Sequence, residues 1–167
     1  FLLALALVVP VAKQAVIHYF GTDYSPYLVS GSSMAPTMED GQAVLINKVR
    51  GRIENGSIII CYLPEAGYRF TIATPPQVIV KRVIAGPGET VDIGADDVIL
   101  INGLAAEEPY LTEAAKSETY LPNYPTHYVL AEDAYFVAGD NRGHSCDSRY
   151  FGAVRSDEII GVVNENT

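Results

Sequence analysis

The chain has 167 residues, of which 49% are hydrophobic and 19% are charged, and its formal net charge at pH 7 is -9. This length is enough for one domain with a buried core, and the apolar fraction excludes a chain that is disordered throughout. The acidic balance and the lack of any run of basic residues exclude a nucleic-acid-binding face, which needs clustered Lys and Arg.

The chain opens on an uncharged apolar run, residues 1–12, which reads FLLALALVVPVA. A bilayer span needs about 20 apolar residues, so this run alone is too short. It starts abruptly and without an initiator Met, so we expect it to be the outer end of a longer transmembrane helix. The apolar centre of a cleavable signal peptide and a buried helix are the alternatives. The aromatic residues between Lys13 and Tyr27 suit a membrane–water interface and equally a core edge.

From residue 43 onward the pattern is typical of short β-strands, rich in β-branched and aromatic residues and bounded by turn residues. The Asn102-Gly103 pair predicts a hairpin, because both residues tolerate a positive φ. No helical periodicity longer than a few turns follows Tyr27, and residues 105–116 hold one short helix at most. The predicted strands are 43–47, 57–62, 77–84, 98–101, 128–130, 134–139 and 159–163.

These segments predict a mostly β fold: a coiled antiparallel sheet or a partly open β-barrel behind an N-terminal apolar membrane helix. We expect residues 1–22 to be the end of a membrane anchor with an interfacial segment. Residues 23–167 would form one water-facing domain. Residues 103–128 are polar and rich in Tyr and Pro, which predicts a small irregular cap.

The stretch SGSSMAPTM, residues 30–38, follows the apolar and aromatic N-terminal part. Gly31 and Pro36 predict an irregular turn that can hold the hydroxyl of Ser33 in the open. Taken alone, such a loop is most often a solvated connector. Two later segments make a functional role more plausible.

The first of these is VIVKRVIAGPGE, which contains Lys81. A serine hydroxyl is a poor nucleophile until a base removes its proton, and a neutral lysine can be that base. Burial among apolar residues would lower the pKa of Lys81 enough for this role. Strand alternation places Lys81 and Arg82 on opposite faces, so the two should have different tasks. The alternative is that Lys81 is an edge-strand charge that discourages aggregation.

The second segment is GDNRGHSCDSR, residues 139–149. It can be a solvated turn with local capping bonds. That interpretation does not require arginines beside both aspartates, whereas a rigid loop around a site does. Asp140 and Asp147 can pair with Arg82, Arg142 or Arg149.

Together the three segments resemble the type I signal peptidase family, in its compact, Gram-positive-like subgroup. Residues 33–37 match an SMxPT motif, residues 81–89 match a KRxxGxPGD-like segment with Ala85 and Glu89 as departures, and residues 139–152 match GDNRxxSxDSRxxG at every fixed position. Residues 102–103 and 108–111 resemble the short cap of that subgroup.

The resemblance implies that Ser33 is the nucleophile and that Lys81 is the general base. It also implies that Ser145 orients the lysine and that Asp140 pairs with Arg82. It further implies that Asp147 and Arg149 brace the loop of residues 139–149.

The activity implied is that of a serine endopeptidase that cleaves N-terminal signal peptides from translocated preproteins after small residues. The implied protein is single-pass in the cell membrane with its catalytic domain on the extracytoplasmic side. Signal peptides and the lipid bilayer are its expected partners, and the secretion machinery is a candidate partner. We expect the substrate pocket to be lined by apolar side chains, with these candidates: Val29, Met34, Met38, Ile60, Ile79 and Val80.

One departure concerns the oxyanion hole. Some members of the family use a serine two residues before the nucleophile, and this chain has Gly31 there. The backbone N–H of Ser33 remains as a donor, and Ser30 and Ser32 are candidates for the second. Losing a donor costs about 2.7–4 kcal/mol of transition-state stabilisation, so a second donor should exist.

Three alternative functions fit the sequence less well. A LexA-like self-cleaving Ser-Lys protease would need a helix-turn-helix segment, which the sequence lacks. A catalytically inactive, membrane-bound binding subunit of the same fold has no need to keep Ser33, Lys81 and Ser145 together. A Ser/His/Asp hydrolase would use His144, which lies in a loop that the resemblance already explains.

The cysteines and histidines give no sign of a metal site. Cys61 and Cys146 lie far apart and form no CxxC pair, so the sequence leaves open a disulfide or two free thiols. The histidines at 18, 127 and 144 lie in unrelated contexts. We therefore predict that the protein uses neither a metal nor a cofactor.

Overall fold

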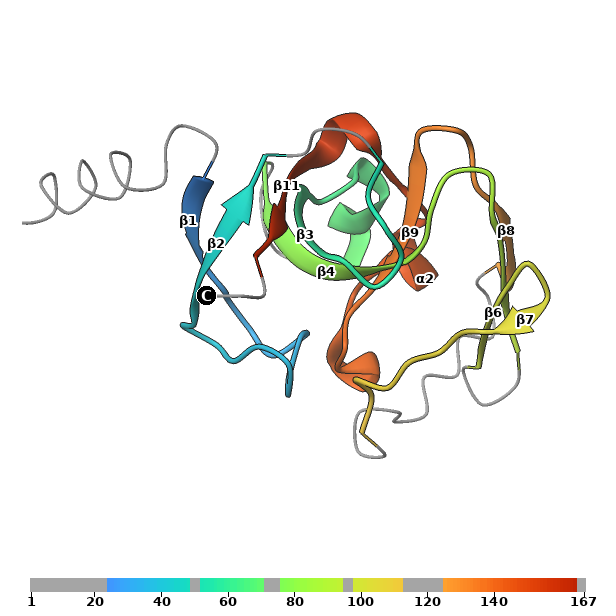
Figure 1. The fold of residues 1–167 in the computed structure, drawn as a ribbon, viewed down its shortest axis with the longest axis horizontal. Helices are drawn as coiled ribbons and strands as arrows, with labels where there is room; N and C mark the ends of the chain where they lie inside the picture. The colour runs from blue at the N-terminus through green and yellow to red at the C-terminus, as the bar shows by residue number, and fades with distance from the viewer. Residues whose placement is uncertain (1–23, 49–51, 71–75, 95–97, 113–124, 165–167) are drawn as a thin grey trace, which may run out of the picture.

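The fold is built from two antiparallel sheets, seen in a computed structural model that describes residues 24–48, 52–70, 76–94, 98–112 and 125–164 (Figure 1). The larger sheet contains, in spatial order, β1 (Tyr24–Leu28), β2 (Ala43–Asn47), β11 (Ile159–Val163), β3 (Ile58–Tyr62), β4 (Val78–Ala85), β9 (Ala134–Ala138) and β10 (Val154–Arg155). The smaller contains β7 (Leu104–Ala105), β6 (Ile99–Ile101), β5 (Thr90–Ile93) and β8 (His127–Val129).

All pairs among the described strands are antiparallel, which confirms the predicted antiparallel architecture. The described strands do not close into a barrel, because β1 and β10 are the edges of the larger sheet and β7 and β8 those of the smaller. All seven predicted strands are present, with ends that differ by at most one residue.

Four observed strands were missed by the sequence prediction, and each lacks an ordinary strand signal. β1 contains Pro26, which cannot donate to a ladder and is tolerated here because β1 is an edge strand. β1 lies within residues 23–167, which were assigned to the water-facing domain, and its Tyr27 packs against the core of that domain. β7 and β10 have only two residues each, and β5 has four.

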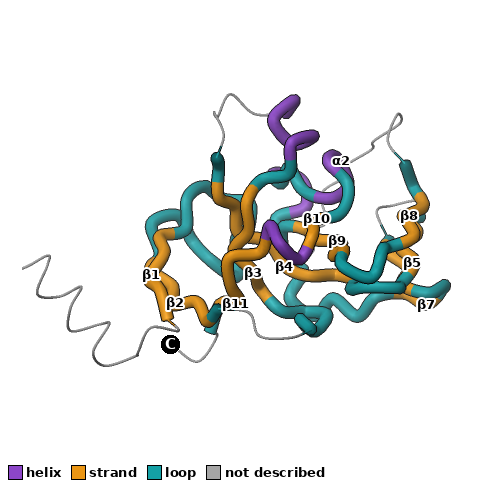
Figure 2. Tube along the Cα trace, turned by 90° about the horizontal axis from the view of Figure 1, so that it is seen from above, coloured by secondary structure: helices purple, strands orange, loops and turns teal. Residues whose placement is uncertain are grey.

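A continuous ribbon connects the two sheets. β4 leads into β5 and β8 leads into β9, while β4 pairs with β9 and β5 pairs with β8. Backbone hydrogen bonds continue the pairing between these strands, from Gly88 N–H to Leu130 O at 3.2 Å and from Leu130 N–H to Glu89 O at 2.9 Å. Seen from above, the smaller sheet lies at the end of the molecule away from β1 and β2 (Figure 2).

The described helices are short, with three to six residues each. Residues 105–112 contain none, so the short helix allowed there is not found in the described part of that segment. The helical turns are η1 (Glu65–Phe70), η3 (Arg142–His144), α2 (Ser148–Phe151) and η4 (Ser156–Glu158).

The predicted N-terminal apolar helix, together with the whole anchor segment 1–22, lies outside the described residues. Among the residues that are described, no helix is long and apolar enough to cross a membrane.

Candidate active site

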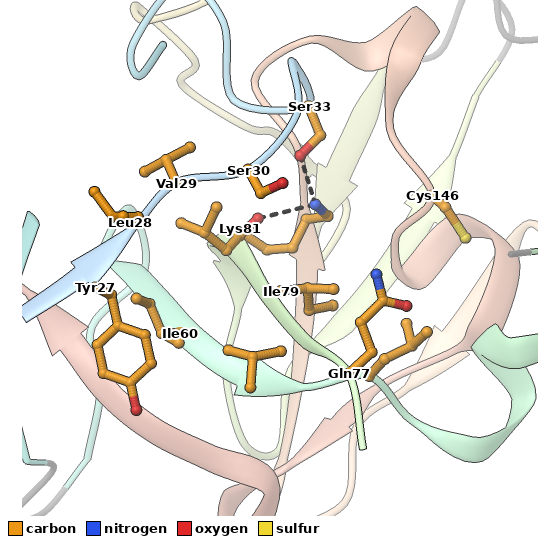
Figure 3. Close-up of a pocket in the computed structure, with 13 residues that line it drawn as sticks. Tyr27, Leu28, Val29, Ser30, Ser33, Ile60, Gln77, Ile79, Lys81 and Cys146 are labelled. Atoms are coloured by element: carbon orange, nitrogen blue, oxygen red, sulfur yellow. Dashed lines mark hydrogen bonds between the residues drawn. The ribbon is translucent and has the colours of Figure 1, made fainter. Parts of the chain in front are cut away.

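Ser33 and Lys81 meet beside β4, an interior strand of the larger sheet. Ser33 lies in the loop after β1, and β4 positions Lys81 by pairing it with Ile59 of β3. The Nζ of Lys81 lies 2.8 Å from Ser33 Oγ and donates to the carbonyl oxygen of Val80 at 2.9 Å (Figure 3). The Val80 bond uses one N–H of the amine, so a neutral Lys81 can direct its lone pair at the hydroxyl.

Lys81 is only 3% exposed. Burial is the main cause that lowers the pKa of Lys81 below its ordinary value, and Arg149 lowers it further. Asp147 and the two thiols act in the opposite direction without reversing the shift. A substantial neutral fraction of the amine is therefore available nearer neutral pH than for a free lysine.

Arg82, the next residue, points to the other face of β4 and has a different task. Its Nε and Nη2 donate to Asp140 Oδ1 and Oδ2 at 2.9 and 2.7 Å, and its Nη1 donates to Gly56 O at 2.7 Å. Both partners are buried, with side-chain exposures of 8% and 0%. This bidentate pair ties the loop after β9 to β4.

Asp147 is the centre of the loop that follows β9. Its carboxylate accepts hydrogen bonds from Gly139 N–H at 3.0 Å and from Nε and Nη2 of Arg149 at 2.8 and 2.9 Å. Burial by itself raises the pKa of Asp147, but Arg149 and the Gly139 N–H outweigh it and hold the pKa below its ordinary value. The ion pair between two fully buried groups fixes the loop beside the dyad.

The backbone of Ser33 is held by Asn141, a residue with no role in the sequence prediction. Asn141 N–H donates to Ser33 O at 3.0 Å, and Asn141 Nδ2 donates to Ser32 O at 3.1 Å. Nearby, Gly31 N–H donates to Asp40 Oδ1 at 2.8 Å. The only available signal for Asn141 was its place between Asp140 and Arg142 in the matched motif.

Ser145 is 5% exposed, and its Oγ has no hydrogen-bond partner among the described residues. The hydroxyl lies near the Asp147 carboxylate and against Gly139 without forming a hydrogen bond of ordinary geometry. The bond from Ser145 to Lys81 that the resemblance implies is therefore not formed in this structure.

A cavity of about 340 Å³ lies beside the dyad. Four of the six predicted pocket residues line it: Val29, Ile60, Ile79 and Val80. Met34 and Met38 instead lie in the core, where they are 0% and 5% exposed and pack with residues of β2, β3 and β4.

Gln77 is a lining residue that the sequence prediction missed. Strand alternation places it on the same face of the chain as Ile79 and Lys81, and its Oε1 is buried without a partner among the described residues. The polar lining of the cavity therefore extends from the dyad to Gln77 (Figure 3).

The backbone N–H of Ser33 donates to no group among the described residues, so it is available to an oxyanion. The hydroxyl of Ser30 points toward the Ser33–Lys81 pair from the cavity wall (Figure 3). Of the two candidates for a second donor, Ser30 is the one that lines the cavity.

The two cysteines are free thiols. Burial raises the pKa of Cys61 to about 12, and Cys146 lines the cavity beside Lys81. Within the described segments, no group of three or more His, Cys, Asp or Glu side chains is placed to hold a metal ion.

Comparison with known proteins agrees with this geometry. The family profile described as "Signal peptidase, peptidase S26" matches residues 2–166. Signal peptidase I T of Bacillus subtilis (strain 168) is 37% identical over 165 residues, which cover 94% of this chain and 79% of that protein. Signal peptidase IB of Staphylococcus aureus (strain COL) is 35% identical over 155 residues, covering 84% of this chain and 75% of that protein.

A solved structure is also similar. The crystal structure of a signal peptidase I from Enterococcus faecalis V583 has a TM-score of 0.51 and 31% sequence identity, and the match covers 70% of this chain and 100% of that chain. The described fold and the sequence therefore lead to one family. The chain belongs to the signal peptidase family, peptidase S26.

Proposed function

We propose that Ser33 is the nucleophile and Lys81 the general base of an endopeptidase that removes N-terminal signal peptides from translocated preproteins. The observation that carries this assignment is the 2.8 Å contact between Ser33 Oγ and a buried amine whose pKa is lowered. The protein is a serine endopeptidase of the signal peptidase type. The relatives are named as signal peptidases, so they do not favour an inactive binding subunit or a self-cleaving repressor.

The proposed reaction begins when neutral Lys81 takes the proton of Ser33 and Oγ attacks the scissile carbonyl. The N–H of Ser33 holds the oxyanion, and we assign the second contact to the hydroxyl of Ser30. The resulting ammonium of Lys81 gives its proton to the leaving amine. A water molecule, activated by Lys81 in the same way, then releases the acyl group from Ser33.

The substrate class follows from the cavity. Its apolar lining, which includes Val29, Ile79 and Val80, suits small side chains before the cut. We further propose that residues 1–22 anchor the protein in the cell membrane, with the catalytic domain on the extracytoplasmic side. The bilayer and the secretion machinery would then be its partners, and tethering would raise the effective concentration of membrane-bound preproteins at Ser33.

The test is cleavage of a purified preprotein with Ala immediately before the cut, followed by intact mass. Replacing that Ala with Phe is expected to reduce turnover at least about tenfold, since this requires only about 1.4 kcal/mol of lost transition-state binding. The control preprotein carries the Phe ten residues into the mature part. Equal cleavage of the Ala and Phe substrates would mean a broad-specificity protease.

Gly139→Ala is expected to lower cleavage about 100-fold or more, because it displaces the catalytic groups. A Cβ at this position would overlap Ser145 Oγ and the carbonyl oxygen of Ser33, and would lie 2.6 Å from Ser145 Cβ. The control is Gly94→Ala, whose Cβ would meet the carbonyl oxygen of Val98 at 3.4 Å. Initial rates and thermal unfolding would be measured together, and near-normal rates in Gly139→Ala would contradict the described spacing of Ser33 and Ser145.

A further inference from the structure

Residues 106–112, called the strap from here on, follow β7 and run back from the smaller sheet toward η3 (Figure 1). The sequence assigned this segment to an irregular cap, and the proposed reaction gives it no role. Two of its side chains, Glu108 and Tyr110, make polar contacts with arginines of the catalytic region.

The first contact joins Glu108 to Arg142. Nη1 of Arg142 donates to Glu108 Oε2 at 3.2 Å, and Nη2 donates to Glu108 Oε1. The side chains are 3% and 14% exposed for Arg142 and Glu108, so this is not a solvent-screened surface pair. Nε of the same Arg142 donates to Gly139 O at 3.1 Å. Glu108 therefore orients the group that holds the carbonyl of Gly139.

The second contact joins Tyr110 to Arg82. The guanidinium carbon of Arg82 lies 4.0 Å from the centre of the Tyr110 ring, within the range of a cation–π interaction. Tyr110 OH donates to Glu108 Oε1 at 2.8 Å, which links the two side chains of the strap. Burial and Glu108 raise the pKa of Tyr110, so the phenol keeps its proton and remains a donor.

The two contacts converge on adjacent residues. Arg142 holds Gly139, and Arg82 holds Asp140 through two hydrogen bonds. The next residue, Asn141, donates its N–H to Ser33 O. The strap thus contacts the two arginines that hold Gly139 and Asp140, and the next residue, Asn141, holds the backbone of Ser33.

We propose that Glu108 and Tyr110 are positioning residues for the cleavage reaction, acting through Arg142 and Arg82 on residues 139–141 and hence on the position of Ser33. The inference rests on the proposed function, because the cleavage rate depends on the position of Ser33 Oγ, the proposed attacking atom. A strap that only stabilised the fold would change the folded fraction and leave the turnover of folded molecules intact.

The experiment compares four variants in steady-state cleavage of the preprotein, each assayed below its melting transition. Glu108→Gln and Tyr110→Leu are expected to lower kcat about tenfold or more with KM within about twofold, because small displacements of reacting groups are costly. Tyr110→Phe keeps the ring over Arg82 and is expected to retain kcat within about threefold. Glu107→Gln, a change at the neighbouring exposed carboxylate, is the matched control and should behave as wild type.

A second readout does not need peptide cleavage. Acylation of Ser33 by an activated ester, followed by intact mass, should slow in Glu108→Gln by a factor similar to the loss of kcat. Unchanged acylation and kcat in both Glu108→Gln and Tyr110→Leu would overturn the inference, as would a loss confined to KM or to the folded fraction. A wild-type chain that acylates at Ser33 without cleaving preproteins would count against the proposed substrate, while the acylation rates would still decide the role of the strap.

Discussion

Replacing Lys81 with methionine is expected to reduce preprotein cleavage by about 10²–10⁴-fold, the usual contribution of a general base. Methionine fills a similar volume among the apolar residues of β4 but cannot accept the proton of Ser33. The amine lies 2.8 Å from Ser33 Oγ and is the basic group hydrogen-bonded to it. Single-turnover cleavage with intact-mass readout measures the loss directly.

Two controls make this result specific. Lys48→Met removes an exposed lysine after β2 and should leave the rate unchanged. His144→Ala should keep most of the activity, because His144 is exposed and contacts Asn141 Oδ1 at 3.3 Å rather than Ser33. An active Lys81→Met enzyme together with an inactive His144→Ala enzyme would show that the base is a histidine.

The same dyad sets the pH dependence. Burial lowers the pKa of Lys81, and only the neutral amine accepts a proton. The single-turnover rate should therefore rise with pH through one ionisation, with a pKa below the value of about 10.4 for free lysine, and then level off. A rate that is independent of pH from neutrality to about pH 10 would contradict a lysine base.

The second large effect is expected for Asp147→Asn, which should lower the free energy of unfolding by about 3–5 kcal/mol. The substitution keeps the shape of the side chain but removes the charge that faces Arg149 in the interior. Both side chains are essentially buried, at 0% and 1% exposure. Urea denaturation followed by circular dichroism measures the change. Asp147→Asn should also shift the pH–rate profile to lower pH, since the Asp147 carboxylate raises the pKa of Lys81.

The matched control is Asp133→Asn, which breaks an exposed pair with Arg155 whose side chains are 41% and 62% exposed. That change should cost no more than about 1 kcal/mol. Equal destabilisation by both variants would contradict the buried pair.

The pKa of Asp147 is lowered in the folded state, so its contribution to stability depends on pH. That contribution is complete above the unfolded pKa of about 3.9 and is lost as pH falls through the folded pKa.

The five longer interior strands of the larger sheet, β2, β3, β4, β9 and β11, were predictable because their apolar, β-branched segments are separated by strong turn residues. β1 could not be predicted in this way, because a strand with a proline is acceptable only at an edge, and the edge is defined by the whole sheet. The two-residue strands β7 and β10 are likewise defined by their partners β6 and β9 rather than by their own residues.

The candidate site was predictable where the chemistry is local. Burial of Lys81 followed from its apolar neighbours, and its separation from Arg82 followed from strand alternation. The inward direction of Met34 and the anchoring role of Asn141 depend on contacts between distant segments, which no local pattern encodes. The contact of the strap with Arg82 and Arg142 is of the same kind.

If Lys81 is the base that we propose, its adjacency to Arg82 on β4 makes the register of this strand a condition for catalysis. A slip of one residue would turn an arginine, which keeps its proton, toward Ser33 and would direct the lysine toward Asp140. The pairing of β4 with β3 is regular across this point, and the irregularity with β9 comes only between Val83 and Ala85. An insertion or deletion in β4 before Lys81 should therefore remove activity by exchanging the positions of these two side chains.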